Sequence, residues 1–475
     1  MKNNHLKRLS FGRILAFASG DIFGGGSFNI INFLYPVFLA FAVGLSAQVA
    51  GILLMITRIF DAVIDPAIGF LSDKLRIRYG TRRGSLIISA PFIVLSMFLM
   101  FYPYSHPSVA VRFTAVLASY MLFCTVQSII MISYFSLSSE ITEDYTERAR
   151  MTSVRLGFSI FISIVCVALP GMIVNHFDGN TGYIVMSLSF GIIFMICVLI
   201  TGLFAKEDVP PPEKVETFSI KDFFKPFQVK PFRQYLYIFL CCQITMAIMS
   251  ALFFFYIDFY YCRDITFQGK SNNVGLLGAA LLFGMQIVAL PVYLKMIKKT
   301  SKTTVYIIGS LIWIISALFL FIIPANSNPI IIYILASVLG IGISGPGLIP
   351  HAIFGDVVDV GNLQFGTYTA GAFSGIANFF NQISQGFGVS FVMFIIGASG
   401  FVEQDIREST VKVASQPGSA QTAIITVLAL APLVFMSFGI FVCTRYRLNK
   451  EKHAQVLDAI QSKTEEQKAN VLQSL

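Results

Sequence analysis

Long apolar stretches recur along the whole of this chain, and they constrain its fold more than any other feature. Each is about as long as the roughly 20 residues that an α-helix needs to cross a bilayer. Only 12% of the 475 residues are charged, which is about half the usual share for a soluble domain. The twelve stretches that we count predict an all-α membrane protein with twelve transmembrane helices and no soluble domain of useful size.

The basic residues indicate how these helices are oriented. Five of them lie in the tight segment from Lys74 to Arg83, and others follow the eighth stretch and fill the longest linker, whereas the opposite loops hold few. By the positive-inside rule the basic loops are cytoplasmic, and so are both termini of a chain with an even number of spans. We expect a multi-pass protein of the plasma membrane, or of the inner membrane if the source is bacterial.

The longest linker, which contains Pro210-Pro211-Pro212, divides the chain into two halves. Each half places a basic loop between its second and third spans, a repetition typical of pseudo-symmetric transporters with a site at the midplane. We predict an N-terminal six-helix bundle at 1–205, a cytoplasmic linker at 206–233, a C-terminal six-helix bundle at 234–445 and a cytoplasmic tail at 446–475. We expect the chain to act as a monomer.

Three charged residues lie inside the second apolar stretch. Arg58, Asp61 and Asp65 are spaced i, i+3 and i+7, so they share one face of a helix. Charges in hydrocarbon persist mainly where they face a cavity, a partner or an ion path, and this face is therefore predicted to look into a wet pathway. Two close carboxylates suit a bound Na⁺ or a shared proton. The alternative is a buried network in which Arg58 neutralises both acids. Two carboxylates and one guanidinium, however, leave one negative charge without compensation, which is costly in a buried site.

The segment Arg58-Ile-Phe-Asp61-Ala-Val-Ile-Asp65-Pro66, followed by Arg78-Tyr-Gly80-Thr-Arg82-Arg83, resembles the glycoside–pentoside–hexuronide:cation symporters. This is the melibiose-permease branch of the major facilitator superfamily. The resemblance covers essentially the full chain through Ser19-Gly20-Asp21, Tyr134-Phe135-Ser136-Leu137, Asp356-Val-Val-Asp359 and Tyr446-Arg-Leu448. It implies the major facilitator fold and alternating access, with a cation gradient that drives uptake of a sugar.

The resemblance also implies roles for single residues. Asp61 and Asp65 match the family's cation-binding carboxylates and form a candidate Na⁺ site. Arg58 matches an arginine beside this site, and Ser128 falls where a hydroxyl of span four joins it. Asp21 matches a carboxylate that binds sugar hydroxyls in this family.

Four departures from melibiose permease affect these expectations. Ile64 replaces an asparagine that binds the cation there, which favours a proton over Na⁺. Met131 replaces a second sugar-binding aspartate, and Phe135 replaces the aromatic residue that stacks on the sugar. Asn381 and Gln382 stand where a lysine of span eleven is common in the family.

Polar and aromatic residues on several spans are candidates for binding the solute. Asp21 lies in an apolar helix, although it could instead reach solvent near a membrane end. Asn378, Asn381, Gln382 and Gln385 form one polar stripe that suits a neutral, hydroxyl-rich ligand, with hydrogen bonding between helices as the alternative. We expect contacts to the solute from Asp21, Gln127, Tyr134, Phe135, Arg155, Asn378 and Gln382.

Charged residues at the cytoplasmic ends are candidates for gating. The basic loop from Arg76 to Arg83, which contains Arg82, is expected to pair with an acidic run and to bias one conformational state. This run consists of Glu140, Glu143, Asp144 and Glu147. Asp356 and Asp359 end span ten and are expected to pair with a Lys or Arg elsewhere. Ordinary charged loops and helix ends are the alternative for each of them.

The sequence thus predicts a secondary active transporter that couples H⁺ or Na⁺ to a small polar solute such as a sugar or glycoside. A lysolipid or another amphipathic solute is the alternative on the same fold, and the loss of an acid at Met131 suits it. An enzyme is disfavoured because no nucleophile–base set, metal-ligand spacing or soluble catalytic domain is visible. A sensor that does not transport is also disfavoured, because sensing does not require the ion path that the charged residues of the second span predict. The expected partners are the solute, the coupling cation and the bilayer, and nucleic acid is not expected as a partner. No cofactor is expected besides the coupling ion.

Overall fold

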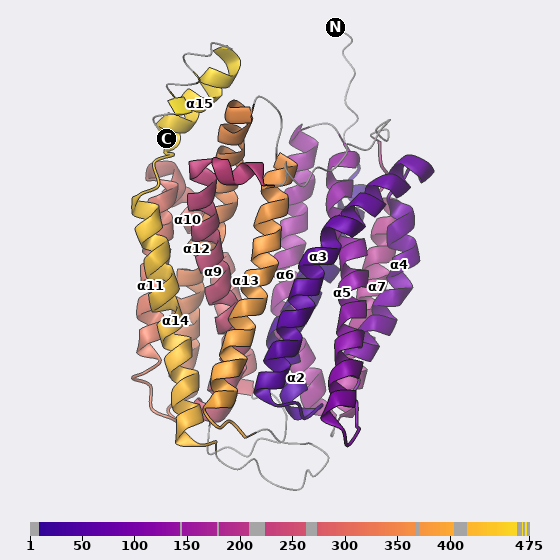
Figure 1. Ribbon diagram of the computed structural model, residues 1–475, viewed down its shortest axis with the longest axis vertical. Coiled ribbons are helices and arrows are strands. Elements are labelled where there is room, and N and C mark those ends of the chain that lie inside the picture. Colours follow the sequence, from indigo (N-terminus) through magenta and orange to yellow (C-terminus); the bar gives the residue numbers. More distant parts are fainter. Residues whose placement is uncertain are drawn as a thin grey trace. The chain divides into compact units, whose positions relative to one another are not determined.

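The computed structural model describes residues 9–142, 145–177, 180–208, 224–262, 273–365, 370–402, 416–462, 468 and 471–472. Over these residues the chain forms helices and no strands (Figure 1). Twelve helices in the described part are long and apolar enough to cross a membrane, from Phe11–Phe41 to Gly418–Thr444. The predicted all-α protein with twelve spans is confirmed.

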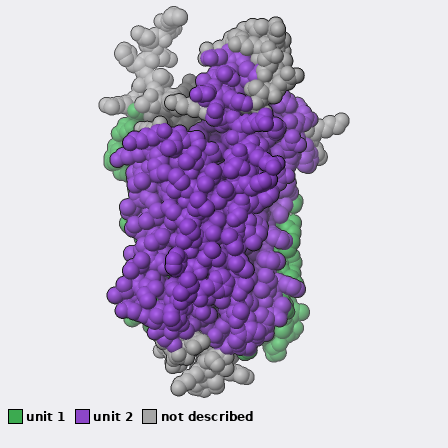
Figure 2. Space-filling model, turned by 90° about the vertical axis from the view of Figure 1, so that its left-hand side faces the viewer, with its two compact units in different colours: residues 1–216, 266–276, 402–414 green, residues 217–265, 277–401, 415–475 purple. Residues whose placement is uncertain are grey.

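The chain divides into two compact units, coloured separately in Figure 2. Unit 1 comprises Met1–Glu216, Thr266–Leu276 and Val402–Ala414, and unit 2 comprises Thr217–Ile265, Leu277–Phe401 and Ser415–Leu475. The four-part division given above, with its boundaries at the linker and the tail, stays a prediction.

The helices of unit 1 are α1 (Phe11–Ser19), α2 (Asp21–Phe41), α3 (Ala47–Tyr79), α4 (Arg83–Met100), α5 (Val109–Glu140), α6 (Tyr145–His176) and α7 (Thr181–Phe204). Unit 2 contains the short η1 (Lys225–Gln228), α9 (Lys230–Tyr256), the π-helical η2 (Ile257–Tyr261), most of α10 (Asn273–Lys299), α11 (Lys302–Phe319), α12 (Pro329–Phe365), α13 (Ala370–Ala398), α14 (Gly418–Thr444) and α15 (Lys450–Ser462).

The first span is divided at Gly20, where α1 gives way to α2. A Cβ atom at Gly20 would lie 2.6 Å from the ring of Tyr134, and one at Gly26 would lie 2.9 Å from the ring of Phe194. Small residues allow helices in membranes to approach this closely. The glycines therefore let the first span pack against α5 and α7, and this packing buries Asp21 inside unit 1.

The turn between α3 and α4 places two arginines at the end of unit 1. Gly80 ends α3 with a positive φ of 74°, and its N–H donates to the carbonyl of Arg76. A left-handed residue at this position is a common way to stop a helix, and glycine adopts it without strain. Because the chain reverses here, Arg82 and Arg83 come to lie beside the last turn of α3. We call this the basic end of unit 1.

Candidate functional site

The predicted coupling residues of α3 meet α5 at a single hydroxyl. Ser128 Oγ lies 3.1 Å from Asp61 Oδ1 and 2.6 Å from Asp65 Oδ1. Asp61 is 7% exposed, Ser128 is also buried and Asp65 is half-buried. The structure thus brings three of the four predicted coupling residues together, and we call Asp61, Asp65 and Ser128 the coupling cluster.

The number of protons in the coupling cluster limits its chemistry. A serine hydroxyl can donate one hydrogen and accept others. If both carboxylates are ionised, Ser128 can donate to only one of them, and its oxygen faces the other without a hydrogen between. One added cation removes this conflict, either as a proton on one acid that donates to Ser128 or as a metal ion among the oxygens. The cluster is therefore suited to take up and release one positive charge.

Arg58 lies one turn before Asp61 and connects α3 to α2. Its Nη2 donates to Asn32 Oδ1 at 3.2 Å, and its charge acts on Asp61. Cys124 on α5 is also buried, and because it lies four residues before Ser128, both are on one face of α5.

A second group of predicted residues gathers around Asp21 at the start of α2. Asp21 is 6% exposed and accepts a hydrogen bond from the Ser159 side chain of α6. Arg155, one turn before Ser159, acts electrostatically on Asp21 and places its guanidinium carbon 5.4 Å from the ring centroid of Phe135. We call Asp21, Phe135 and Arg155 the solute cluster.

The solute cluster offers three complementary kinds of contact. Asp21 accepts hydrogen bonds, and Phe135, whose side chain is 49% exposed, presents an aromatic ring. Arg155 Nε is a buried donor that has no hydrogen-bond partner within the described part of the chain. A carboxylate, an aromatic face and an unused guanidinium donor together suit a ligand that has both hydroxyl groups and an apolar face.

Met131 supplies an apolar wall beside this cluster. A Cβ atom at Gly24 would overlap the Met131 side chain and would lie 3.4 Å from Asp21 Oδ1. The thioether of Met131 therefore lies over α2 next to the carboxylate. It occupies the place where the sequence resemblance leads us to expect a second acid.

Two other predicted solute residues take part in helix packing. Tyr134 is buried, its hydroxyl donates to the carbonyl of Phe17 at 3.0 Å, and its ring stacks on Phe17 with centroids 4.8 Å apart. Gln127 Nε2 lies 3.5 Å from Ser27 Oγ on α2. Both contacts join α5 to the first span, so a role of these residues in binding the solute stays a prediction.

The polar stripe of α13 lies in unit 2. Asn381 Oδ1 accepts from Gln243 Nε2 of α9 at 2.8 Å and from Gln385 Nε2 at 3.1 Å. The bond from Gln243 joins α9 to α13 and matches the alternative that the stripe serves hydrogen bonding between helices, whereas the bond from Gln385 lies within α13. Asn378 is exposed and Gln382 is half-buried, and their predicted contacts to the solute stay predictions.

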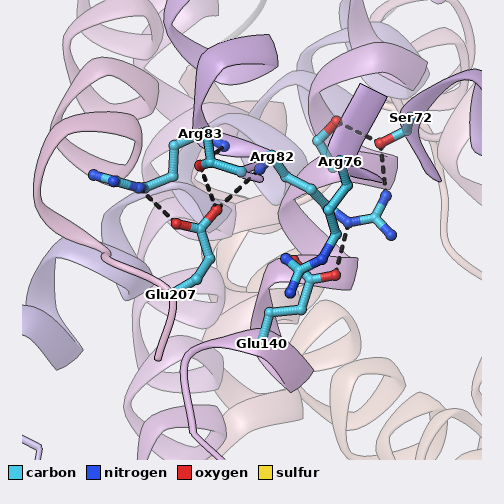
Figure 3. A network of polar contacts seen from close by, with 8 residues as sticks. Ser72, Arg76, Arg82, Arg83, Glu140 and Glu207 are labelled. Atoms are coloured by element: carbon cyan, nitrogen blue, oxygen red, sulfur yellow. Dashed lines mark hydrogen bonds and ion pairs between the residues drawn. The ribbon is translucent and has the colours of Figure 1, made fainter. Parts of the chain in front are cut away.

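Figure 3 shows a network of charged residues at the basic end of unit 1. Arg82 Nε lies 2.8 Å from Glu140 Oε1, and Arg76 pairs with the same carboxylate. Arg82 Nη1 also donates to Ser72 Oγ at 2.7 Å. One glutamate at the end of α5 thus joins two arginines from the end of α3 and the start of α4.

The second acid of this network is Glu207, which follows α7. It accepts from Thr81 Oγ1 at 2.7 Å, from the Arg82 backbone N–H at 2.9 Å and from Arg83 Nε at 2.8 Å. The predicted partners Glu143 and Asp144 lie outside the described residues. Every contact in Figure 3 joins parts of unit 1, so the network holds together the ends of α3, α4, α5 and α7.

We did not identify Glu207 from the sequence. Burial by itself raises the pKa of this carboxyl, but the hydrogen bonds from Thr81, Arg83 and Arg82 outweigh that effect and lower its pKa below the usual 4.5. The carboxylate is thus the form that the folded protein stabilises.

We expect Glu207→Gln to reduce stability at pH 7 by about 2 kcal/mol, because hydrogen bonds to a charged group are lost. The unfolded carboxyl titrates near 4.5, so the contribution is complete above that pH. It disappears as the pH falls through the lower pKa of the folded state. Melting midpoints of both proteins in detergent, measured between pH 7 and pH 3, should therefore converge towards the acid end.

The neighbouring exposed Asp208, which pairs with Arg13 at 2.7 Å, provides the matched control. Asp208→Asn should change the midpoint little, since solvated ion pairs contribute less than about 1 kcal/mol. A constant difference between wild type and Glu207→Gln at every pH would contradict this account.

The predicted gating acids of unit 2 lie at the end of α12. Asp356 Oδ2 is 2.6 Å from Lys302 Nζ at the start of α11. Asp359 Oδ2 is 2.9 Å from His453 Nε2 of α15, a helix that buries Val456. These contacts attach α11 and the C-terminal helix to α12, and a role in gating stays a prediction.

The sequence profile of a family described as "MFS/sugar transport protein" matches residues 16–450. A glucuronide carrier protein homolog from Escherichia coli (strain K12) is 23% identical over 472 residues, which cover 96% of this chain and 97% of that protein. The sodium-dependent lysophosphatidylcholine symporter 1-B of Danio rerio is 23% identical over 473 residues, which cover 90% of this chain and 86% of that protein.

Among solved structures, a bacterial homolog of the human lysosomal transporter Spinster, inward-facing and unoccupied, superposes with a TM-score of 0.65 at 12% identity. The match covers 93% of this chain and 100% of that chain, and it shows a shared fold. The family resemblance expected from the sequence is thereby confirmed, as is the expectation of a transporter rather than an enzyme.

Proposed function

This chain belongs to the MFS/sugar transport protein family, and from that premise we propose that it carries a sugar or glycoside together with one cation by alternating access. The observation that carries the proposal is the coupling cluster, in which two carboxylates of α3 share the hydroxyl of Ser128. A buried site that needs one added cation can couple the conformational state of a transporter to a cation gradient.

The proton is the coupling ion that we favour. Within the described part of the chain, the hydrogen-bonding contacts of Asp61 and Asp65 all involve Ser128. Ile64, beside Asp65, offers no side-chain oxygen. A proton needs one carboxylate and one acceptor, whereas Na⁺ needs several more oxygens. Uptake driven by a Na⁺ gradient at constant pH, without response to a pH gradient, would assign Na⁺ instead.

The solute cluster supports a hydroxylated solute. Asp21 can accept from sugar hydroxyls, the Phe135 ring can pack on the apolar face of a sugar, and Arg155 Nε can donate to a ring, glycosidic or carboxylate oxygen. The relative named as a glucuronide carrier protein homolog fits this chemistry.

We expect Asp21→Asn to weaken glycoside binding by about ten- to a hundredfold, since a hydrogen bond to a charged group contributes about 1.5–3 kcal/mol. The measurement is calorimetric binding of 4-nitrophenyl β-D-glucuronide and 4-nitrophenyl β-D-glucoside to purified protein. The dependence of uptake on the cation gradient should keep its midpoint. If Asp21→Asn shifts only that midpoint, Asp21 belongs to the coupling site and the two roles are reversed.

A lysolipid is the second candidate solute, and Met131 is the observation that favours it. Its thioether makes the wall beside Asp21 apolar, and one relative is named as a lysophosphatidylcholine symporter. Saturable uptake of lysophosphatidylcholine into proteoliposomes, without uptake of either glycoside, would select this candidate.

The cellular setting is also part of the proposal. We infer that both termini and the basic end of unit 1 face the cytoplasm, because the basic loops cluster there. We further infer that the chain works as a monomer in the plasma membrane or the bacterial inner membrane. We keep Arg82, Arg83, Asp356 and Asp359 as residues whose ion pairs bias one conformational state.

A further inference from the structure

Three amides of unit 2, Gln243, Asn381 and Gln385, form what we call the amide cluster. They lie on α9 and α13, and the latter includes the candidate span Phe373–Ala398. Exposure decreases along the polar stripe of α13, from the exposed Asn378 through the half-buried Asn381 to Gln385, which is 6% exposed. An exposed amide in lipid is costly, so we infer that the open end of this stripe faces water.

The hydrogen bonds inside the amide cluster leave one acceptor unused. Both Gln243 Nε2 and Gln385 Nε2 donate to Asn381 Oδ1. Gln385 Oε1 is buried and has no hydrogen-bond partner within the described part of the chain. A buried acceptor without a partner destabilises the folded protein, and an apolar side chain of the same length would avoid this loss of stability.

The unused acceptor indicates what kind of group could complete the cluster. A carbonyl oxygen binds a hydroxyl or N–H donor. In the described part of the chain, the polar contacts of these three amides are with one another and include no cation. A carboxylate or phosphate would therefore meet an electron-rich oxygen without a compensating charge, whereas a neutral hydroxyl would find its acceptor.

We propose that the amide cluster is a ligand half-site of unit 2, where the side-chain carbonyl of Gln385 accepts a hydrogen bond from a neutral hydroxyl of the transported solute. This inference rests on the proposed function and narrows it, because the solute must present an uncharged hydroxyl to unit 2. Gln243 and Asn381 act as positioning residues, because their hydrogen bonds fix the Gln385 amide.

The test is Gln385→Met, which keeps the length of the side chain and removes its polar atoms. We expect the melting midpoint of the ligand-free protein to stay the same or rise, because an unsatisfied acceptor is removed. We expect the affinities for 4-nitrophenyl β-D-glucoside and 4-nitrophenyl β-D-glucuronide to fall by about five- to tenfold, which corresponds to one lost hydrogen bond. Calorimetric titration measures both affinities.

Two further variants make the result specific. Gln234→Met removes an amide near the N-terminal end of α9, where Gln234 Nε2 donates to the carbonyl of Arg445 at 3.1 Å, and it should leave both affinities unchanged. Gln385→Glu keeps carbonyl acceptors but loses the hydrogen bond to Asn381 Oδ1 that fixes the side chain, so its glycoside affinity should lie between those of Gln385→Met and wild type. If Gln385→Met does not fold, unchanged glycoside affinity in the folded Gln385→Leu protein, which also lacks the acceptor, would overturn the proposal.

The outcomes separate this inference from the proposed function. Unchanged glycoside affinity in Gln385→Met, with wild type binding both glycosides, would overturn the half-site alone. A lower melting midpoint with unchanged affinity would assign the amide to packing between helices. Wild type that binds lysophosphatidylcholine but neither glycoside would overturn the proposed solute class and this inference with it.

Discussion

Replacing either carboxylate of the coupling cluster, in Asp61→Asn or Asp65→Asn, is expected to abolish accumulation of solute against its gradient. Each change removes one of the two acids that share Ser128 Oγ at 3.1 and 2.6 Å. The remaining carboxylate can then be satisfied by Ser128 and the new amide N–H without an added cation. The energetic link between the cation gradient and the solute is lost, although the solute cluster is untouched.

The measurement is uptake of a labelled glycoside into proteoliposomes under an imposed pH or Na⁺ gradient. We expect the internal concentration in both variants to stop at the external value, while exchange of internal for external solute continues. Asp458→Asn on the exposed face of α15 makes the same chemical change away from the site and should accumulate solute like wild type. Normal accumulation by both variants would show that the coupling site lies elsewhere.

Removing the shared acid at the basic end of unit 1, in Glu140→Gln, is expected to cause the largest loss of stability. Its carboxylate is paired with both Arg76 and Arg82, whose side chains are almost fully buried. Breaking a buried pair from one side leaves charge without compensation and typically costs about 3 kcal/mol or more. The melting midpoint in detergent should fall accordingly.

A second substitution separates this charge effect from a loss of packing. Replacing Arg82 by Met in the Glu140→Gln background removes one of the uncompensated charges, so the double variant should recover part of the lost stability. Glu451→Gln on the exposed part of α15 is the matched control and should melt like wild type. If the double variant is less stable than Glu140→Gln, the hydrogen bond of Arg82 to Ser72 matters more than the ion pairs.

Much of the fold could be predicted because hydropathy is a local property. A helix must satisfy its backbone hydrogen bonds within lipid, so an apolar stretch of sufficient length has few alternatives. Twelve apolar stretches were expected, and twelve helices long enough to span a membrane are found in the described part of the chain, among them Pro329–Phe365. The period of the α-helix is also a local property, and it predicted that Arg58, Asp61 and Asp65 share one face of the second span.

The partners of particular side chains could not be predicted, because they depend on how helices distant in the sequence pack together. The hydrogen bond from the Tyr134 hydroxyl to the carbonyl of Phe17 was not expected, and it forms because the glycines of the first span bring that helix close to α5. The basic loop was expected to pair with the acidic run that begins at Glu140, and Glu140 does pair with Arg76 and Arg82. Arg83 instead contacts Glu207, more than 120 residues away in the sequence.

The sequence by itself therefore determined the twelve spans and the charged face of the second span, since each is encoded by composition and spacing along one segment. It also indicated the transporter family, through a resemblance carried by motifs spread over the chain. The family resemblance placed Ser128 at the coupling site, but only the tertiary structure decided that its one hydroxyl contacts both Asp61 and Asp65, and that Gln385 keeps an acceptor without a partner in the described part of the chain. The relative register of two packed helices sets which polar atoms meet, and no local pattern in either helix encodes that register.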